Sequence, residues 1–205
     1  IRMRLVGSEM CIRDRNNCLS ANTCQKFIDL LDNNTNLAKQ GHLGDEPMDD
    51  IELAINIYQH PDLRKGISET FQKYLDKYPL LKTNFTTWVV DGNAQLMRYE
   101  PNNYCHKIHC ESYGDERVFA WMIFLNTIKN GGGTEFIHQG VTAQPIAGDM
   151  YVWAAGWTHF HRGVVAPNER KYIITGWASD FEEYKKKYPT ELRLSLSSAN
   201  HKILT

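Results

Sequence analysis

Near Thr86 the sequence changes from helical to strand periodicity, and this change limits the folds that the chain can adopt. Residues 118–125 are almost wholly apolar, which predicts a strand that is covered on both faces. Further β-rich runs alternate with glycine-containing turns, at 87–90, 94–99, 150–153 and 171–177. Six or more short strands that follow helices predict a mainly β fold, an antiparallel barrel or jelly roll with helices packed outside it.

The segments around these strands also carry local signals. Asp91-Gly92-Asn93 lies between two of the runs and predicts a β-hairpin. Residues 61–78 have apolar side chains at helical spacing, with Pro61 in the first turn. Residues 35–50 are polar and contain two glycines and a proline, so we expect a loop there.

Two more helices are expected, one near each end of the chain. Ser20 is a suitable N-cap for an amphipathic run that ends at Asn33. The charged residues 181–188 predict a short helix.

We expect one domain over residues 16–190, with a helical part at 16–85 and a jelly-roll core at 86–180. Residues 191–205 are expected to be a loosely ordered tail. Residues 1–15 resemble translated sequencing-adapter sequence, so we expect a non-native segment there, and the natural N-terminus is expected to be missing.

Charge and cysteine content exclude several classes of protein. The net charge of −1 gives no field that would favour nucleic acid or an anionic membrane, and no apolar run is long enough to cross a bilayer. Five cysteines without a paired pattern do not predict a disulfide framework. We therefore expect a cytoplasmic protein that binds neither nucleic acid nor membrane, while its oligomeric state is not readable from the sequence.

Two histidine-containing motifs carry the chemistry. His109 and Glu111 are two residues apart, which places both side chains on one face of a strand, whereas Cys110 should point to the opposite face. A distal histidine would complete two imidazoles and one carboxylate, the ligand set of mononuclear non-haem Fe(II) oxygenases. His159 and His161 have the same strand parity, so alternation does not choose between them.

Lys171 follows His161 by ten residues. It shares one strand face with Ile173, Thr175 and Trp177, and this face points either into a cavity or to solvent. A buried lysine requires an anionic partner, which a bound dicarboxylate would supply. We prefer His161 over His159 as the distal ligand because of its place before Lys171.

From Ala94 to Ala178 the sequence resembles the Fe(II)/2-oxoglutarate-dependent dioxygenases of the prolyl 4-hydroxylase-like group. Seven pieces match in the order of that family: LMRYEP at 96–101, HCE at 109–111, 117–126, GGGTEF at 131–136, PIAG at 145–148, HRG at 161–163 and KYIITGW at 171–177. The HCE and THFHRG segments resemble the small forms found in viruses and marine bacteria. A virus-encoded protein that acts in the host cell fits this expectation.

The resemblance implies a fold, a ligand set and cofactors. The fold is a double-stranded β-helix, a cupin-like jelly roll. The implied cofactors are Fe(II), 2-oxoglutarate and dioxygen, with ascorbate as a candidate reductant. The implied iron ligands are His109, Glu111 and His161, and the implied 2-oxoglutarate contacts are Tyr99, Thr134 and Lys171. Glu111 departs from the commoner H-x-D motif by one methylene.

The resemblance also implies hydroxylation of a C–H bond in a peptide or protein, with a prolyl residue as the first expectation. Free amino acids and other small molecules are alternative substrates. The candidate rim aromatics are Tyr104, Tyr113, Trp157 and Phe160. A non-catalytic jelly-roll binding module and a cupin enzyme of another chemistry are alternative functions, and succinate release with oxygen uptake separates them.

Overall fold

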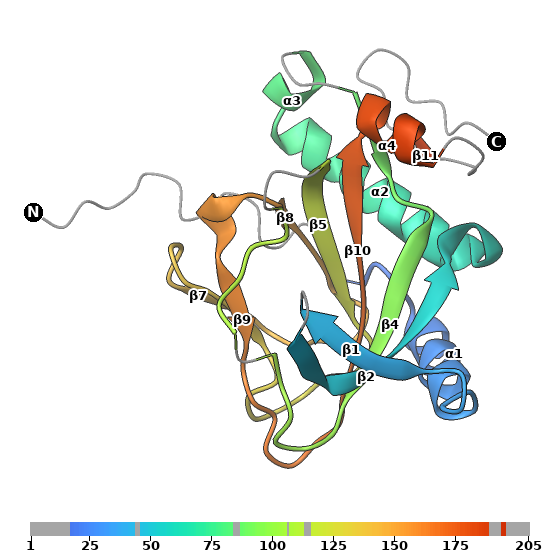
Figure 1. The fold of residues 1–205 in the computed structure, drawn as a ribbon, viewed down its shortest axis with the longest axis vertical. Helices are drawn as coiled ribbons and strands as arrows, with labels where there is room; N and C mark the ends of the chain where they lie inside the picture. The colour runs from blue at the N-terminus through green and yellow to red at the C-terminus, as the bar shows by residue number, and fades with distance from the viewer. Residues whose placement is uncertain are drawn as a thin grey trace, which may run out of the picture.

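The computed structural model describes residues 17–43, 46–83, 87–105, 107–112, 116–188 and 194–195 (Figure 1). The helices are α1 (Ala21–Asp32), α2 (Pro61–Lys77), α3 (Leu80–Thr83) and α4 (Phe181–Lys187), with the 3-10 turns η1 (Ile57–Gln59) and η2 (Trp157–His159). The strands are β1 (Lys39–Leu43), β2 (Glu46–Asn56), β3 (Trp88–Val90), β4 (Asn93–Tyr99), β5 (Arg117–Phe124), β6 (Thr134–Phe136), β7 (Val141–Ala143), β8 (Met150–Ala154), β9 (His161–Gly163), β10 (Lys171–Asp180) and β11 (Leu194–Ser195). The adapter-like residues 1–15 and most of the expected tail lie outside this described part.

Two antiparallel sheets form the jelly roll. In the larger sheet, β1, β2, β4 and β10 follow one another, and β10 also pairs with β5, which pairs with β8. The short strands β3 and β11 extend this sheet, because β3 pairs with β10 and β11 pairs with β3. The smaller sheet has the order β7-β6-β9. The predicted mainly β jelly roll with flanking helices is therefore confirmed.

The main hydrophobic core lies between the larger sheet and the helices. Helix α2 contributes Leu63, Ile67 and Phe71 to it, and all three side chains are fully buried. Their spacing of four residues keeps them on one face of the helix. The Phe71 ring lies 5.0 Å from the Trp88 ring and 6.2 Å from the Phe119 ring, so one phenyl group joins the helix to β3 and β5.

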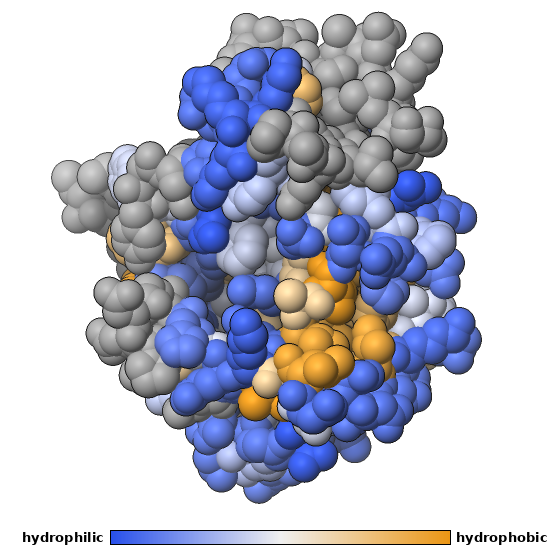
Figure 2. Space-filling model, turned by 45° about the vertical axis from the view of Figure 1, so that its right-hand side comes forward, coloured by the Kyte–Doolittle hydropathy of each residue, from blue (hydrophilic) through white to orange (hydrophobic). Residues whose placement is uncertain are grey.

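A second apolar cluster fills the interior between the two sheets. It includes Met122 and Phe124 of β5, Phe136 of β6 and Trp153 of β8. Because alternate residues of β5 enter the two clusters, the strand is covered on both faces, as the apolar run 118–125 predicts. The surface in Figure 2 is mostly hydrophilic, with one compact apolar area. None of the helices in the described residues has the length and hydropathy to cross a bilayer.

The helix predictions are confirmed near both ends of the chain. Ser20 caps α1, and its Oγ accepts a hydrogen bond from the Thr23 amide at 3.1 Å. Helix α2 begins at Pro61, where the missing proline N–H leaves no helical hydrogen bond unmade. Helix α4 covers residues 181–187, within the predicted segment.

The prediction of a loop at residues 35–50 is wrong. The part at 16–85, which was expected to be helical, also contains strands. These residues contain β1 and the start of β2, which pair with each other and extend the larger sheet through β4. Ile51, Leu53 and Ile55 alternate along β2 and pack on the outer core, while Glu52 lines the interior cavity. The polar residues on the cavity side hid the strand pattern from the sequence analysis.

The predicted hairpin at Asp91-Gly92-Asn93 is also wrong. Strands β3 and β4 do not pair with each other; both pair with β10, β3 near Ala178 and β4 near Ile173. Each is antiparallel to β10, so the two strands run in the same direction, and the chain bends without reversing. The Asp91 amide donates to Trp177 O at 3.0 Å and links the two strands to β10 at the bend.

Replacement of Phe71 by alanine should lower the free energy of unfolding by about 3–5 kcal/mol, because it leaves a cavity between α2 and the sheet. Urea denaturation of the full chain measures this change. Leu37→Ala is the matched control, because the Leu37 side chain is 62% exposed, and its effect should stay within about 0.5 kcal/mol. Equal losses in the two variants would contradict the assignment of this core.

Candidate active site

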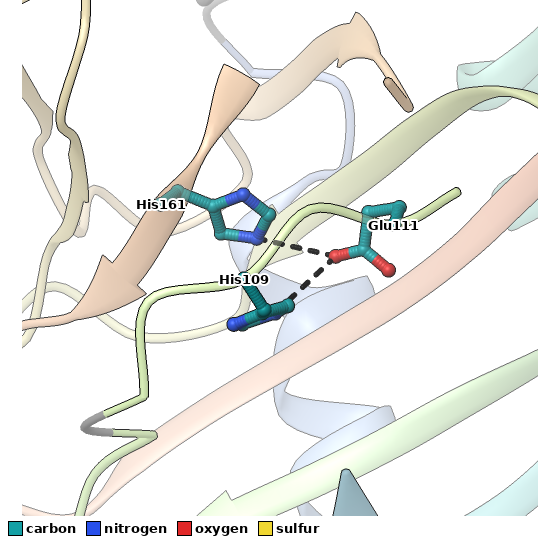
Figure 3. Close-up of side chains that lie close together, drawn as sticks. All are labelled: His109, Glu111 and His161. Atoms are coloured by element: carbon teal, nitrogen blue, oxygen red, sulfur yellow. Dashed lines mark ion pairs between the residues drawn. The ribbon is translucent and has the colours of Figure 1, made fainter. Parts of the chain in front are cut away.

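A short backbone bridge brings together two distant histidines. His109 lies between β4 and β5, and His161 is the first residue of β9. The His109 amide donates to His161 O at 3.0 Å, and the His161 amide donates to His109 O at 2.8 Å. Two residues further on, the Glu111 amide donates to Ala155 O at 2.9 Å. These bonds direct the three side chains toward one another (Figure 3).

The facing atoms are two imidazole nitrogens and one carboxylate oxygen. Glu111 Oε1 lies 3.2 Å from His161 Nε2 and 3.7 Å from His109 Nε2. One ion with metal–ligand bonds of roughly 2.0–2.2 Å can span separations of this size. Within the described residues, this trio is the one group of three or more His, Cys, Asp or Glu side chains arranged to hold a metal.

The second ring nitrogen of each imidazole, Nδ1, contacts a backbone carbonyl that fixes the ring. His109 Nδ1 lies 3.0 Å from Lys107 O, and His161 Nδ1 lies 2.9 Å from His159 O. A carbonyl oxygen only accepts hydrogen bonds, so both Nδ1 atoms carry a proton and donate it. In the neutral rings this leaves the Nε2 lone pairs for a metal, and such outer contacts fix the orientation of metal-binding histidines.

The electrostatics of the trio favour a cation between the three groups. Burial alone would raise the pKa of Glu111, but hydrogen bonds with His109 and His161 hold it well below its usual range. Burial likewise disfavours the charged form of His109, yet hydrogen bonds with Cys105 and Glu111 raise its pKa to about 11. The ionised carboxylate thus attracts a proton onto the His109 imidazole, and a metal cation can take the place of that proton. The donor set of two nitrogens and one oxygen fits Fe(II).

The trio opens into an interior cavity of about 260 Å³ between the two sheets. Lys171, Ile173, Thr175 and Trp177 of β10 all line this cavity, whereas Tyr172 and Ile174 pack in the outer core. The predicted alternation therefore places the lysine face inward. Tyr99 of β4 and Thr134 of β6 line the same cavity.

Lys171 is a buried cation at this cavity. The residue is 5% exposed, and its Nζ lies 5.4 Å from the centre of the Tyr99 ring and 5.5 Å from that of Phe124. Burial lowers the pKa of Lys171 to about 8, against the weaker opposing effect of Cys105 and Asp50. A desolvated ammonium against aromatic rings binds an anion such as a carboxylate favourably.

Tyr99 and Thr134 place polar groups beside this cation. Tyr99 is directly opposite Lys171 in the β4–β10 ladder, and burial raises the pKa of its phenol well above the usual value. The phenol therefore keeps its proton and can donate a hydrogen bond. Thr134 is also buried, and its Oγ1 lies 3.8 Å from Met122 Sδ.

The structure also describes several of the other residues that the sequence analysis named. His159 is in η2, and its Nδ1 lies 2.9 Å from Thr158 Oγ1, while its carbonyl holds the His161 ring. Trp157 is 72% exposed, and Cys110 is buried with Sγ 3.2 Å from Ser112 O. Tyr113 lies outside the described residues.

The sequence analysis gave no site role to Arg117 or Cys105, although both line the cavity. Cys105 Sγ lies 3.8 Å from His109 Nδ1. Arg117 approaches Glu111 from β5, with Nη1 3.1 Å from Glu111 O. Strand parity would have placed Arg117 on the outer face with Phe119, and only the irregular β5–β10 pairing at this end of the strand turns it toward the cavity. The loop that carries Cys105 has no regular periodicity.

Comparisons with known proteins agree with this architecture. The 2OG-Fe(II) oxygenase superfamily matches residues 94–179. A viral collagen prolyl hydroxylase from Paramecium Bursaria Chlorella virus-1 is 15% identical, with a TM-score of 0.60 over 80% of this chain and 93% of that chain. A prolyl-4-hydroxylase from Pseudomonas putida is 17% identical, with a TM-score of 0.61 over 80% and 90%.

A prolyl hydroxylase from Trichoplax adhaerens, in complex with a hypoxia inducible factor peptide fragment, is 16% identical. Its TM-score is 0.63 over 82% of this chain and 83% of that chain. No curated protein matches the sequence. Residues 94–179 thus match the 2OG-Fe(II) oxygenase superfamily, and the chain is an oxygenase whose cofactors are Fe(II), 2-oxoglutarate and dioxygen.

Proposed function

We propose that this oxygenase hydroxylates a C–H bond of a prolyl or other residue in a peptide or protein. In this proposal Fe(II) is held by His109, Glu111 and His161, and 2-oxoglutarate is bound by Tyr99, Thr134 and Lys171. The observation that carries it is the coexistence of the histidine–glutamate trio and a buried lysine in one cavity. A non-catalytic module would need neither group there.

In this proposal the site residues have separate roles in binding and orienting the cofactors. When bound, Fe(II) together with 2-oxoglutarate supplies the oxidising chemistry that hydroxylates the substrate. The two Nε2 atoms and one carboxylate oxygen would hold the ion, and a three-ligand set of this kind would leave positions open for 2-oxoglutarate and dioxygen. Lys171 neutralises the far carboxylate of 2-oxoglutarate. The Tyr99 hydroxyl keeps its proton and donates a hydrogen bond to the same cosubstrate. The buried walls exclude water from the reacting groups.

A peptide substrate is supported by two observations. The compared solved structures include prolyl hydroxylases, and one of them is a complex with a peptide fragment. Trp157, two residues before His159, presents an indole that is 72% exposed, and Ile108 beside His109 is 52% exposed. Exposed aromatic and apolar side chains that are close in sequence to the metal trio suit an extended peptide with proline rings.

His109→Ala and His161→Ala should each abolish Fe(II)-dependent succinate release, because each removes one ligand atom. His159→Ala is the matched variant and should keep Fe(II) binding, since the carbonyl that holds His161 belongs to the backbone. Anaerobic Fe(II) titration and a succinate assay measure both properties. Retained activity in His161→Ala together with its loss in His159→Ala would make His159 the distal ligand.

Lys171→Ala should weaken 2-oxoglutarate binding by about two to four orders of magnitude, because loss of one partner of a buried ion pair costs roughly 3–5 kcal/mol. Fe(II) affinity should change little.

In the wild type the ammonium form of Lys171 binds the 2-oxoglutarate dianion, so the affinity for 2-oxoglutarate is highest at low pH and falls as the pH rises through about 8. Lys171→Arg, which stays charged, should lack this fall. Anaerobic titration at several pH values gives the affinities, and unchanged binding by Lys171→Ala would exclude the role.

Proline-rich peptides should stimulate succinate release and gain one oxygen atom by mass spectrometry. Trp157→Ala should raise the KM for such peptides while succinate formation without peptide stays the same, because the exposed indole lies outside the metal trio. Failure across a broad peptide panel, with turnover of a free amino acid or another metabolite, would reject the peptide substrate and leave the oxygenase assignment standing.

A further inference from the structure

Glu111 has one more rotatable bond than the aspartate of the commoner motif. Fixing such a side chain costs conformational entropy, so an ordered glutamate ligand needs a restraint beyond its own backbone. In the structure its two oxygens have different partners. Oε1 faces His109 and His161, whereas Oε2 accepts a hydrogen bond from Trp177 Nε1 at 2.8 Å (Figure 3 shows the two oxygens of Glu111).

The Trp177 indole is itself held firmly. Trp177 is opposite Ala120 in the β10–β5 ladder. Its carbonyl accepts hydrogen bonds from the Asp91 amide at 3.0 Å and from Trp121 Nε1 at 3.4 Å. The indole N–H therefore approaches Glu111 from a central strand that is paired on both sides.

Arg117 contacts both Trp177 and Glu111. Its Cζ lies 4.0 Å from the centre of the Trp177 ring, a cation–π contact. Its Nη1 donates to the Glu111 carbonyl at 3.1 Å and lies 4.0 Å from Oε2. The guanidinium thus fixes the indole plane and the Glu111 backbone at the same time.

We propose that Trp177, braced by Arg117, is a positioning residue that holds Glu111 as a one-oxygen metal ligand. This inference rests on the proposed role of the trio in holding Fe(II). An indole N–H on Oε2 makes the carboxylate less able to bind the ion through both oxygens. One-oxygen binding keeps open a coordination position that a two-oxygen carboxylate would fill. Trp177 thereby compensates for the longer side chain of Glu111.

Trp177→Phe tests the proposal, because it removes the N–H and keeps an aromatic face for Arg117. Fe(II) affinity of the full chain, measured by anaerobic titration, should fall about 10–100-fold, the usual effect of losing an outer contact to a metal ligand. The visible absorption of the Co(II)-loaded protein, which reports coordination number, should also shift. Trp157→Phe is the control for loss of an indole and should change neither property.

A double-variant cycle separates positioning from general packing. Glu111→Asp shortens the carboxylate, so its far oxygen no longer reaches the indole. Adding Trp177→Phe to Glu111→Asp should therefore cause little further loss of Fe(II) affinity. Additive losses would mean that the indole acts through packing and would overturn the proposal, as would wild-type affinity in Trp177→Phe.

A separate variant, His109→Ala, distinguishes this inference from the function on which it rests. Metal binding that survives His109→Ala would show that the trio is not the metal site, and both proposals would then fail. Binding that depends on His109 but is unchanged in both affinity and Co(II) spectrum by Trp177→Phe rejects only the positioning role. Thermal melting of each metal-free variant checks that it is folded.

Discussion

The antiparallel pairing of β10 with β4 and β5 is the constraint on which the site depends. Because side chains alternate along a strand, this central position sends Lys171 and Trp177 into the cavity and Ile174 into the outer core. A buried cation of the cavity and the indole that contacts Glu111 are thereby fixed by one register. A slip of β10 by one residue would turn both away from the metal trio.

Strand parity explains how much of the site the sequence could predict. His109 and Glu111 could be placed together because they are two residues apart, and Lys171 because its strand has a regular alternation. Parity could not choose between His159 and His161, because the two histidines have the same parity; in the structure His159 ends η2, whereas His161 begins β9. The backbone bridge between His109 and His161 provides the missing information, and it joins residues that are far apart in the sequence.

The parts of the fold that sequence analysis missed border the cavity. Strand β2 carries Glu52 toward the cavity, and burial raises the pKa of this carboxyl group. Such a polar inner face weakens the hydrophobic signal of a strand, although Ile51 and Leu53 still alternate on the outer face. The turn at Gly92 was misread for a related reason, because its local sequence fits a reversal while pairing with β10 keeps β3 and β4 in line.

The two hydrophobic clusters show how the fold can tolerate charges at its centre. Burying Lys171 and Glu111 is unfavourable in itself, and only hydrogen bonds, aromatic contacts or bound ligands offset that cost. The outer cluster, built from α2 and the larger sheet, supplies apolar burial that does not involve the cavity. Stability and chemistry therefore rest on opposite faces of the same strands. Ligands that complete the charges of the cavity should then stabilise the folded chain by mass action, through contacts that the unfolded chain cannot make.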